Sequence, residues 1–258
     1  MSRVPVRLAL MVLTGVFLTS APPALAEPYL AGFAGAAITE DKDLGVMLNL
    51  TTGLNTLSAE GKLKGLEFDT SVLFGAKAGY FFNGFLGGSF GLEAEGYHFR
   101  PDLDDQTVTF SGTVQGVPTT AQVNVRGDLE ATGIGLNLLY RFQLARSPAA
   151  PRGRVQPYLG LGVGALIAKL ELHSVVLDGR PTADDTDVRP ALHVIAGARV
   201  HLTEHVALFT EYKFIHTGEF EFNLKQTGTL SGTPATESFR VRTRLTGHHL
   251  YAGVGFHW

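Results

Sequence analysis

The last ten residues of the chain alternate strictly between apolar side chains and polar or small ones. One set, on a single face, comprises Leu250, Ala252, Val254, Phe256 and Trp258. Because successive side chains of a β-strand point to opposite sides of a sheet, this pattern predicts a strand with one strongly apolar face. Either a soluble sheet or a membrane wall could contain such a strand. Which of the two applies depends on how often the pattern recurs and on the cellular compartment to which the protein is targeted.

The N-terminus has the features of a secretory signal. Two arginines precede the apolar run 8–18, which is too short to cross a bilayer, and Ala24-Leu25-Ala26 offers a cleavage site with small residues. We therefore expect residues 1–26 to be a cleaved signal peptide and residues 27–258 to form the mature domain. An export signal places this domain outside the cytoplasm.

Composition removes several classes of protein. Without the leader the chain has 19 Lys and Arg against 24 Asp and Glu, a net charge of −5, so no basic surplus favours nucleic acid. There is no cysteine, which excludes disulfides and thiolate chemistry. After the leader there is no run of about twenty apolar residues, so no spanning helix is expected.

Seven further segments alternate in the same way as the C-terminal one. Many of the chain's 31 glycines lie inside these segments, where they would leave room for large neighbours in a narrow interior. The predicted strands cover 29–38, 68–82, 86–99, a segment ending at 142, 157–169, 190–202, 206–214 and 249–258.

The connections between these segments alternate in length. Asn83-Gly84 and Thr203-Glu204-His205 predict tight turns, whereas other gaps span about twenty to thirty residues. Transmembrane barrels combine short periplasmic turns with long extracellular loops in this way. Parts of the long gaps alternate as well, and we expect the hairpin around Gly116-Val117-Pro118 to extend the barrel beyond the membrane. The long gaps are 39–67, 100–129, 170–189 and 217–247.

Charge is confined to one face of the predicted strands. The faces that carry the large apolar residues contain almost no charge, while the opposite faces carry four cations and three anions. A soluble ligand-binding barrel would show the reverse polarity. We therefore predict an all-β fold, an eight-stranded antiparallel up-and-down transmembrane β-barrel, with an internal charge network formed by Lys77, Glu93, Glu95, Arg141, Arg199, Glu211 and Lys213.

Strand order suggests which charges of this network pair. Glu93 and Glu95 are expected to meet Lys77 and Arg141 on the neighbouring strands. Glu211 and Lys213 are expected to meet Arg199. Aromatic residues near strand ends are expected to form interfacial girdles, the alternative being ordinary strand formers; they are Tyr29, Tyr80, Phe82, Tyr140, Phe142, Tyr158, Phe256 and Trp258.

Three stretches of the sequence resemble a known family. The terminal stretch 247–258 is similar to the closing strand of small bacterial outer-membrane β-barrels, and 211–216 and 157–162 are similar to other strands of that family. The family is the OmpA/OmpX-like, or porin family, β-barrel domain. The resemblance implies a location in the outer membrane and contact with outer-membrane lipids and lipopolysaccharide. It also implies that the assembly machinery reads the C-terminal strand and its last aromatic residue, here Trp258.

Three functions are compatible with this fold. The first is a structural or surface-interaction role, in which the long exterior loops contact an extracellular ligand. The second is a narrow pore, but eight strands leave an interior just wide enough for side chains. The seven charged residues, with Tyr97 and Asn137, should fill it, so we predict no steady conductance.

The third function is an enzyme of the lipid A deacylase type, which would need a serine beside a histidine. His216 is followed by Thr217 and Gly218, and His173-Ser174 are adjacent and would face opposite ways. We therefore predict no enzymatic activity. Four histidines have the parity of inward-facing residues: His193, His201, His249 and His257. Parity alone does not bring them close together, as a metal site would require. We therefore expect hydrogen-bonded histidines in the lumen and no metal or other cofactor.

Overall fold

The computed structural model describes residues 26–40, 43–85, 88–145, 153–173, 177–178 and 182–258. In this part of the chain every regular element is a β-strand, and all strand pairings are antiparallel. No helix of the described residues has the length and apolar character needed to cross a membrane. The predicted signal peptide lies outside the described residues, apart from Ala26.

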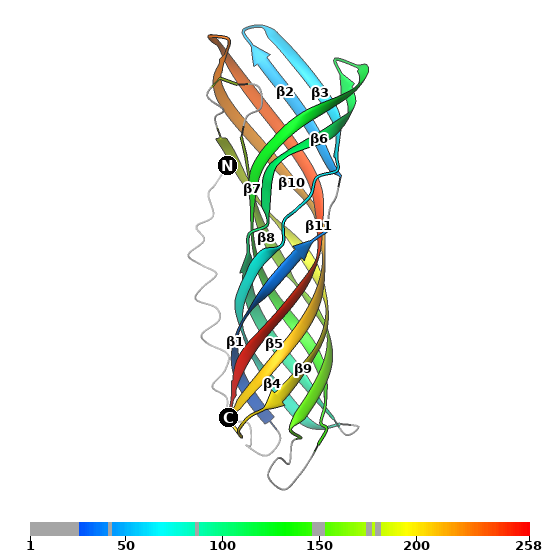
Figure 1. Ribbon diagram of the computed structural model, residues 1–258, viewed down its shortest axis with the longest axis vertical. Helices are drawn as coiled ribbons and strands as arrows, with labels where there is room; N and C mark the ends of the chain where they lie inside the picture. The colour runs from blue at the N-terminus through cyan, green and yellow to red at the C-terminus, as the bar shows by residue number, and fades with distance from the viewer. Residues whose placement is uncertain (1–25, 41–42, 86–87, 146–152, 174–176, 179–181) are drawn as a thin grey trace.

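Eleven strands form one sheet, and eight of them close a ring. Going around this ring the order is β1, β4, β5, β7, β8, β9, β10 and β11, and β11 pairs back with β1 from Tyr29↔His257 to Thr39↔Gly247. The strands tilt across the wall of an elongated barrel (Figure 1). Their bounds are β1 Ala26–Thr39, β2 Leu44–Thr52, β3 Asn55–Lys64, β4 Ser71–Phe85, β5 Gly88–Phe99, β6 Asp102–Val114, β7 Val117–Phe142, β8 Val155–His173, β9 Thr182–His201, β10 Val206–Leu230 and β11 Thr233–His257.

One end of the barrel continues as an extension. There β7 leaves β5 and pairs with β6, and the chain of pairs runs through β3 and β2 to the upper half of β11. β2, β3 and β6 belong only to this end (Figure 1). The beginning of β1 and the C-terminus lie at the other end, together with the turn between β9 and β10. Short turns face the periplasm in outer-membrane barrels, so the extension faces the cell exterior.

The wall of the extension is interrupted between β9 and β10. Their backbone pairing stops at Thr217↔Ala191, and above this point aspartates of β9 accept hydrogen bonds from the backbone of β10. Asp187 Oδ2 accepts from the Glu221 N–H at 2.8 Å, and Asp185 Oδ2 accepts from the Asn223 N–H at 2.7 Å. These side chains take the place of a strand partner for two backbone N–H groups of the β10 edge.

A β-bulge in β10 accompanies this interruption. The register with β11 shifts between His216 and Glu219, so that β10 gains one residue. Below the bulge odd-numbered side chains such as Lys213 face the interior, and above it even-numbered ones such as Phe220 do so. The bulge therefore changes which residues of the strand face inward.

The eight predicted strands are confirmed, and several are longer than predicted. The hairpin predicted at Gly116 is present, with its turn at Gln115 and Gly116. Two predicted loops are largely strand: 39–67 contains β2 and β3, and 217–247 consists mostly of the paired upper halves of β10 and β11. Exposed polar residues on the outer face of the extension give these segments the composition of loops. The tight turn expected at Asn83-Gly84 is instead an irregular part of β4, which continues to Phe85.

Candidate functional site

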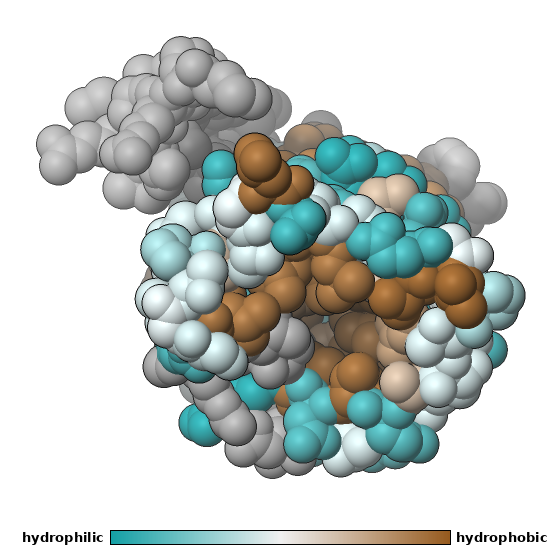
Figure 2. All heavy atoms as spheres, turned by 90° about the horizontal axis from the view of Figure 1, so that it is seen from above, coloured by the Kyte–Doolittle hydropathy of each residue, from teal (hydrophilic) through white to brown (hydrophobic). Residues whose placement is uncertain are grey.

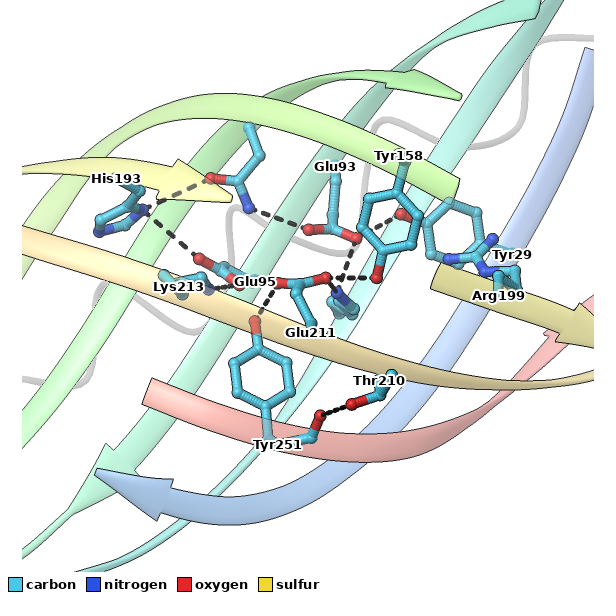
Figure 3. Close-up of polar contacts among 12 residues, drawn as sticks. Tyr29, Glu93, Glu95, Tyr158, His193, Arg199, Thr210, Glu211, Lys213 and Tyr251 are labelled. Atoms are coloured by element: carbon cyan, nitrogen blue, oxygen red, sulfur yellow. Dashed lines mark hydrogen bonds and ion pairs between the residues drawn. The ribbon is translucent and has the colours of Figure 1, made fainter. Parts of the chain in front are cut away.

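The interior of the ring holds all seven residues of the predicted charge network. Each of them has at most 6 % of its surface exposed. The side chains come from β4, β5, β7, β9 and β10. Figure 3 shows Glu93, Glu95, Arg199, Glu211 and Lys213 lying together inside the ring. An interior so filled by side chains is typical of an eight-stranded barrel. We call this group of residues, together with Glu27, the charge plug.

Lys77 and Glu211 form the centre of the charge plug. Lys77 Nζ on β4 lies 2.5 Å from Glu211 Oε2 on β10 and 3.3 Å from Glu93 Oε2 on β5. Since β4 and β10 are not neighbours in the ring, the first of these ion pairs crosses the lumen. One ammonium group thus joins two strands from opposite walls and balances one of the two negative charges, while tyrosine hydroxyls also donate to both carboxylates.

A second cross-lumen pair lies on the side of the extension. Lys213 Nζ on β10 donates to Glu95 Oε2 on β5, and the other oxygen of Glu95 lies 3.5 Å from His193 Nδ1. The amide of Asn137 connects this level to the centre, because its Nδ2 donates to Glu93 Oε1 at 2.9 Å and its Oδ1 lies 3.4 Å from His193 Nδ1. The lysines therefore pair across the barrel, and not only with the neighbouring strand as expected.

The predicted partners of the two arginines are wrong. Arg141 binds Glu27, with 2.7 Å between Nη2 and Oε2, and also contacts Ser89 and Gln156. Arg199 places its guanidinium carbon 4.4 Å from the centre of the Tyr29 ring and its Nη1 3.3 Å from His257 Nε2. Arg141 thus pairs with a carboxylate of β1, and Arg199 packs against a tyrosine of the same strand.

Glu27 is a functional residue that the sequence pattern did not reveal. It is fully buried, and its Oε1 lies 2.6 Å from His257 Nδ1. With it, the plug contains four acidic residues for four basic ones. Its position next to the predicted cleavage site made it look like part of a terminal segment. The alternation of the strand that follows provided a signal, since Glu27 has the same parity as Tyr29, Ala31 and Phe33.

Two tyrosines predicted for the interfacial girdles lie inside the plug instead. Tyr29 donates to Glu93 Oε2, and Tyr158 donates to Glu211 Oε2 at 2.7 Å. Each faces a glycine of the neighbouring strand, and a Cβ atom at Gly79 or Gly197 would lie 2.6 or 2.4 Å from the tyrosine ring. Glycines therefore make the room that these large side chains occupy, as their frequency in the strands predicted.

The outer face of the ring is apolar. Leu136, Leu161 and Leu192 on three consecutive strands are 60–66 % exposed, with no charged residue beside them on that face. The sequence profile of the family described as outer membrane protein beta-barrel domain matches residues 28–257. The chain belongs to this family. The protein is thus a transmembrane β-barrel of the bacterial outer membrane, and its apolar outer face contacts lipid.

The chain is also similar, at low sequence identity, to several solved structures. Similar solved structures include Neisserial surface protein A (14 % identity, 89 % of this chain and 96 % of that chain, TM-score 0.36). OprG from Pseudomonas aeruginosa matches with 15 % identity, coverage of 91 % and 96 %, and a TM-score of 0.43. Ail of Yersinia pestis matches with 11 % identity, coverage of 88 % and 98 %, and a TM-score of 0.33. A search of curated proteins gave no match.

Two groups of side chains in the barrel could in principle place three ligand atoms around a metal ion. Glu27, His201 and His257 form one, and Glu93, Glu95 and Glu211 form the other. The arrangement of cations does not suit a divalent ion, because Arg141 and Arg199 occupy the first group and the two lysines bind the carboxylates of the second. Many of the oxygen and nitrogen atoms that a metal would need already contact these cations or a neighbouring side chain, as His201 Nε2 does at 3.2 Å from Gln156 Oε1.

The C-terminal strand forms part of the lipid-facing wall. Leu250, Val254, Phe256 and Trp258 are 52–58 % exposed on the outer face, while Tyr251 and His257 of the same strand point into the lumen. Tyr251 donates a hydrogen bond to Glu211 Oε1 (Figure 3). The strand that closes the ring thus also binds the centre of the charge plug.

Proposed function

We propose that this outer-membrane barrel is a non-conducting anchor that presents its extension as a surface for interactions outside the cell. The observation that carries this proposal is the charge plug: cross-lumen ion pairs and three tyrosines occupy the interior at the level of the lipid-facing wall. A path for hydrated ions would require these buried pairs to separate, which costs several kcal/mol for each unpaired charge.

Conductance across a planar bilayer tests the proposal. The purified, folded barrel should insert without producing stable current steps, and insertion is verified independently by protease digestion of the exposed extension. Stable, ion-selective steps from inserted protein would support the narrow-pore alternative and overturn the anchor.

The tips of the extension support a role in surface interaction. Leu54, at the turn between β2 and β3, is fully exposed, and Val117, at the turn between β6 and β7, is 62 % exposed. Apolar side chains at the far end of a water-exposed structure offer contact area for an extracellular ligand. Replacing Leu54 and Val117 by serine should reduce attachment of expressing cells to a ligand-coated surface without lowering the amount of folded barrel. Equal attachment by both proteins would contradict this role.

We also propose that the barrel has no enzymatic activity. His216 forms a hydrogen bond of 3.2 Å with Thr246 Oγ1, and the adjacent Thr217 hydroxyl donates to the Leu245 carbonyl, so neither is arranged as a nucleophile with its base. His173 is described, but Ser174 lies outside the described residues. Release of fatty acid from lipid A by the purified protein, lost on His216→Ala, would contradict this part of the proposal.

Lipids and the assembly machinery complete the proposed partners. The outer face of β11 changes from Leu250 to the exposed Arg242 and Arg240, and such guanidiniums suit the phosphates of lipopolysaccharide. Replacing both arginines by glutamine should weaken binding to lipopolysaccharide vesicles but not to phosphatidylcholine vesicles.

The assembly signal is proposed to be the lipid-facing side of the C-terminal strand, so Trp258→Ala should slow the appearance of folded protein in the outer membrane. Unchanged rates would exclude it.

A further inference from the structure

The interior of the extension contains an apolar cavity. Its volume is about 260 Å³, and it lies among strands β2, β3, β6, β7, β8 and β11. Seen from above, hydrophobic residues surround a hollow at the centre of the barrel mouth, and hydrophilic residues are concentrated on the outer rim (Figure 2). We call this cavity the apolar chamber; its lining includes Leu44, Val46, Ala59, Phe110, Val123 and Val241.

The chamber is lined almost entirely by carbon. Leu44 and Phe110 on its wall are buried, and Val46, Ala59 and Val123 are half-buried. A water molecule needs two to four polar partners to remain in a cavity, and these apolar side chains offer none. The polar residues of the lining are Thr119, Asn124, Arg126 and His173, and the buried Nδ1 of His173 has no hydrogen-bond partner among the described residues. An apolar cavity of roughly 150 Å³ is large enough to bind benzene, so the chamber admits a somewhat larger molecule, of about ten non-hydrogen atoms.

The surroundings of the chamber make it a defined space. Val241 of the lining lies across the ladder from Phe222 on β10. Phe222 stacks on Phe220 with ring centres 5.8 Å apart, and both are fully buried. Protein interiors are normally packed so closely that voids larger than a water molecule are few. We therefore interpret a cavity of this size among well-packed neighbours as a binding site and not as a packing defect.

The chamber does not lead through the membrane. The charge plug fills the same barrel between the chamber and the periplasmic end, with Lys213 and Glu95 paired across the lumen. An apolar molecule that enters from the mouth would have to displace this pair to pass further. The chamber is thus a closed-ended site that opens toward the cell exterior.

We propose that the apolar chamber binds a small uncharged molecule of hydrocarbon character, such as a single substituted aromatic ring, taken from the external medium. The size and lining of the chamber determine this class, because its wall is mostly carbon and a charged group would lose most of its hydration there. The chamber lies inside the extension, above the part of the barrel that lipid surrounds. This inference does not depend on the proposed non-conducting anchor, because a barrel that conducts could still bind such a molecule.

Methyl NMR of the full barrel in lipid nanodiscs, titrated with toluene, tests the inference. The methyl signals of Val46, Val123 and Val241 should shift and saturate as toluene is added. The lipid-facing methyls of Leu250 and Val254 should shift in proportion to the toluene dissolved in the lipid, without saturation. Chamber signals that follow the lipid-facing ones would overturn the proposal.

Variants that fill the chamber provide the matched control. Ala59→Phe should raise the half-saturating concentration of toluene by about tenfold or more. Ala252→Phe, which adds the same ring on the lipid-facing wall, should leave it unchanged. If Ala59→Phe does not fold, Val46→Phe replaces it. Equal binding by the filled and unfilled proteins would overturn the proposal.

A lipid chain is the competing occupant. Magnetisation transfer from acyl chains to the chamber methyls before any toluene is added would show that membrane lipid fills the chamber, and this result would also overturn the proposal. Transfer confined to the lipid-facing methyls is the expected result.

Discussion

The part of the barrel in the membrane and the extension above it have opposite interiors. On β10, Glu211 and Lys213 face inward at the level of the lipid, whereas Phe220 and Phe222 face inward in the extension. The outer faces are reversed as well, from exposed Leu208 to the ion-paired Glu221. The apolar side of this one strand therefore faces outward where lipid surrounds the barrel, and faces inward where water surrounds it.

This difference shows which surface determines the sequence of each region. Within the membrane the apolar requirement is met by the outer wall, so polar and charged groups are tolerated inside as long as they pair. In the extension the wall is hydrated, so the apolar side chains must bury themselves in the interior. The interior of the extension is thus a hydrophobic core, and the interior at the membrane is an ion-pair network.

The strongest test of the contrast removes one charge from the plug. Lys77→Met should lower the free energy of unfolding of the barrel by about 5 kcal/mol, because Glu93 and Glu211 both lose their closest cation in a buried site. Urea unfolding followed by the gel shift of the folded barrel measures the change. Adding Glu211→Gln to this variant should recover part of the loss. A midpoint equal to that of the unmodified protein would show that the plug does not stabilise the fold.

A change of intermediate size addresses the hydrophobic core of the extension. Phe222→Ala should reduce the local stability of the extension by about 3 kcal/mol, since a fully buried ring is lost. Hydrogen exchange of the β10 and β11 amides should increase above the bulge and remain unchanged below it. Equal loss of protection in both regions would show that they unfold as one unit and that the contrast does not extend to stability.

The smallest effect is expected at an ion pair on the outer face of the extension. Lys169 lies 3.5 Å from Asp184, and the two side chains are 41 % and 57 % exposed. Lys169→Met should change the free energy of unfolding by less than about 1 kcal/mol, because water screens the pair. The same urea series as for Lys77→Met measures it. A loss as large as that of the plug variant would mean that burial does not separate the two kinds of pair.

Much of the fold follows from the sequence, because the alternation of apolar and polar side chains along a strand depends only on what surrounds each face of the sheet. The outward set of the C-terminal strand and the inward positions of Lys77 and Glu211 were both predictable from parity. The strands of the extension were not, since in β3 exposed residues such as Glu60 and Lys62 resemble those of a loop. Only the pairing with β2 and β6 shows that they belong to a sheet.

The partners within the plug are less predictable than its members. Parity gives the direction of each side chain but not its height along the tilted barrel. Arg141 illustrates this, because its neighbour across the ladder is Ser89 and its ion pair is formed with Glu27 from a third strand. The apolar chamber is also absent from any local pattern, since it arises only where six strands curve around a common space.

The bulge of β10 shows where this protein can change length by one residue without turning side chains to the other face. A single residue deleted between His216 and Glu219 would remove the bulge, and Glu219 would still lie opposite Arg244, so Glu219 and Glu221 would stay on the outer face and the phenylalanines in the hydrophobic core. A single residue deleted from the regular part of the strand above or below would instead reverse the faces of the residues beyond it. Insertions at the distal turn, at Ser231 and Gly232, do not change the orientation of any residue below them. Homologues are therefore expected to vary in length at the tip of this hairpin and by one residue at the bulge, while retaining the number of residues in the regular parts of the strand.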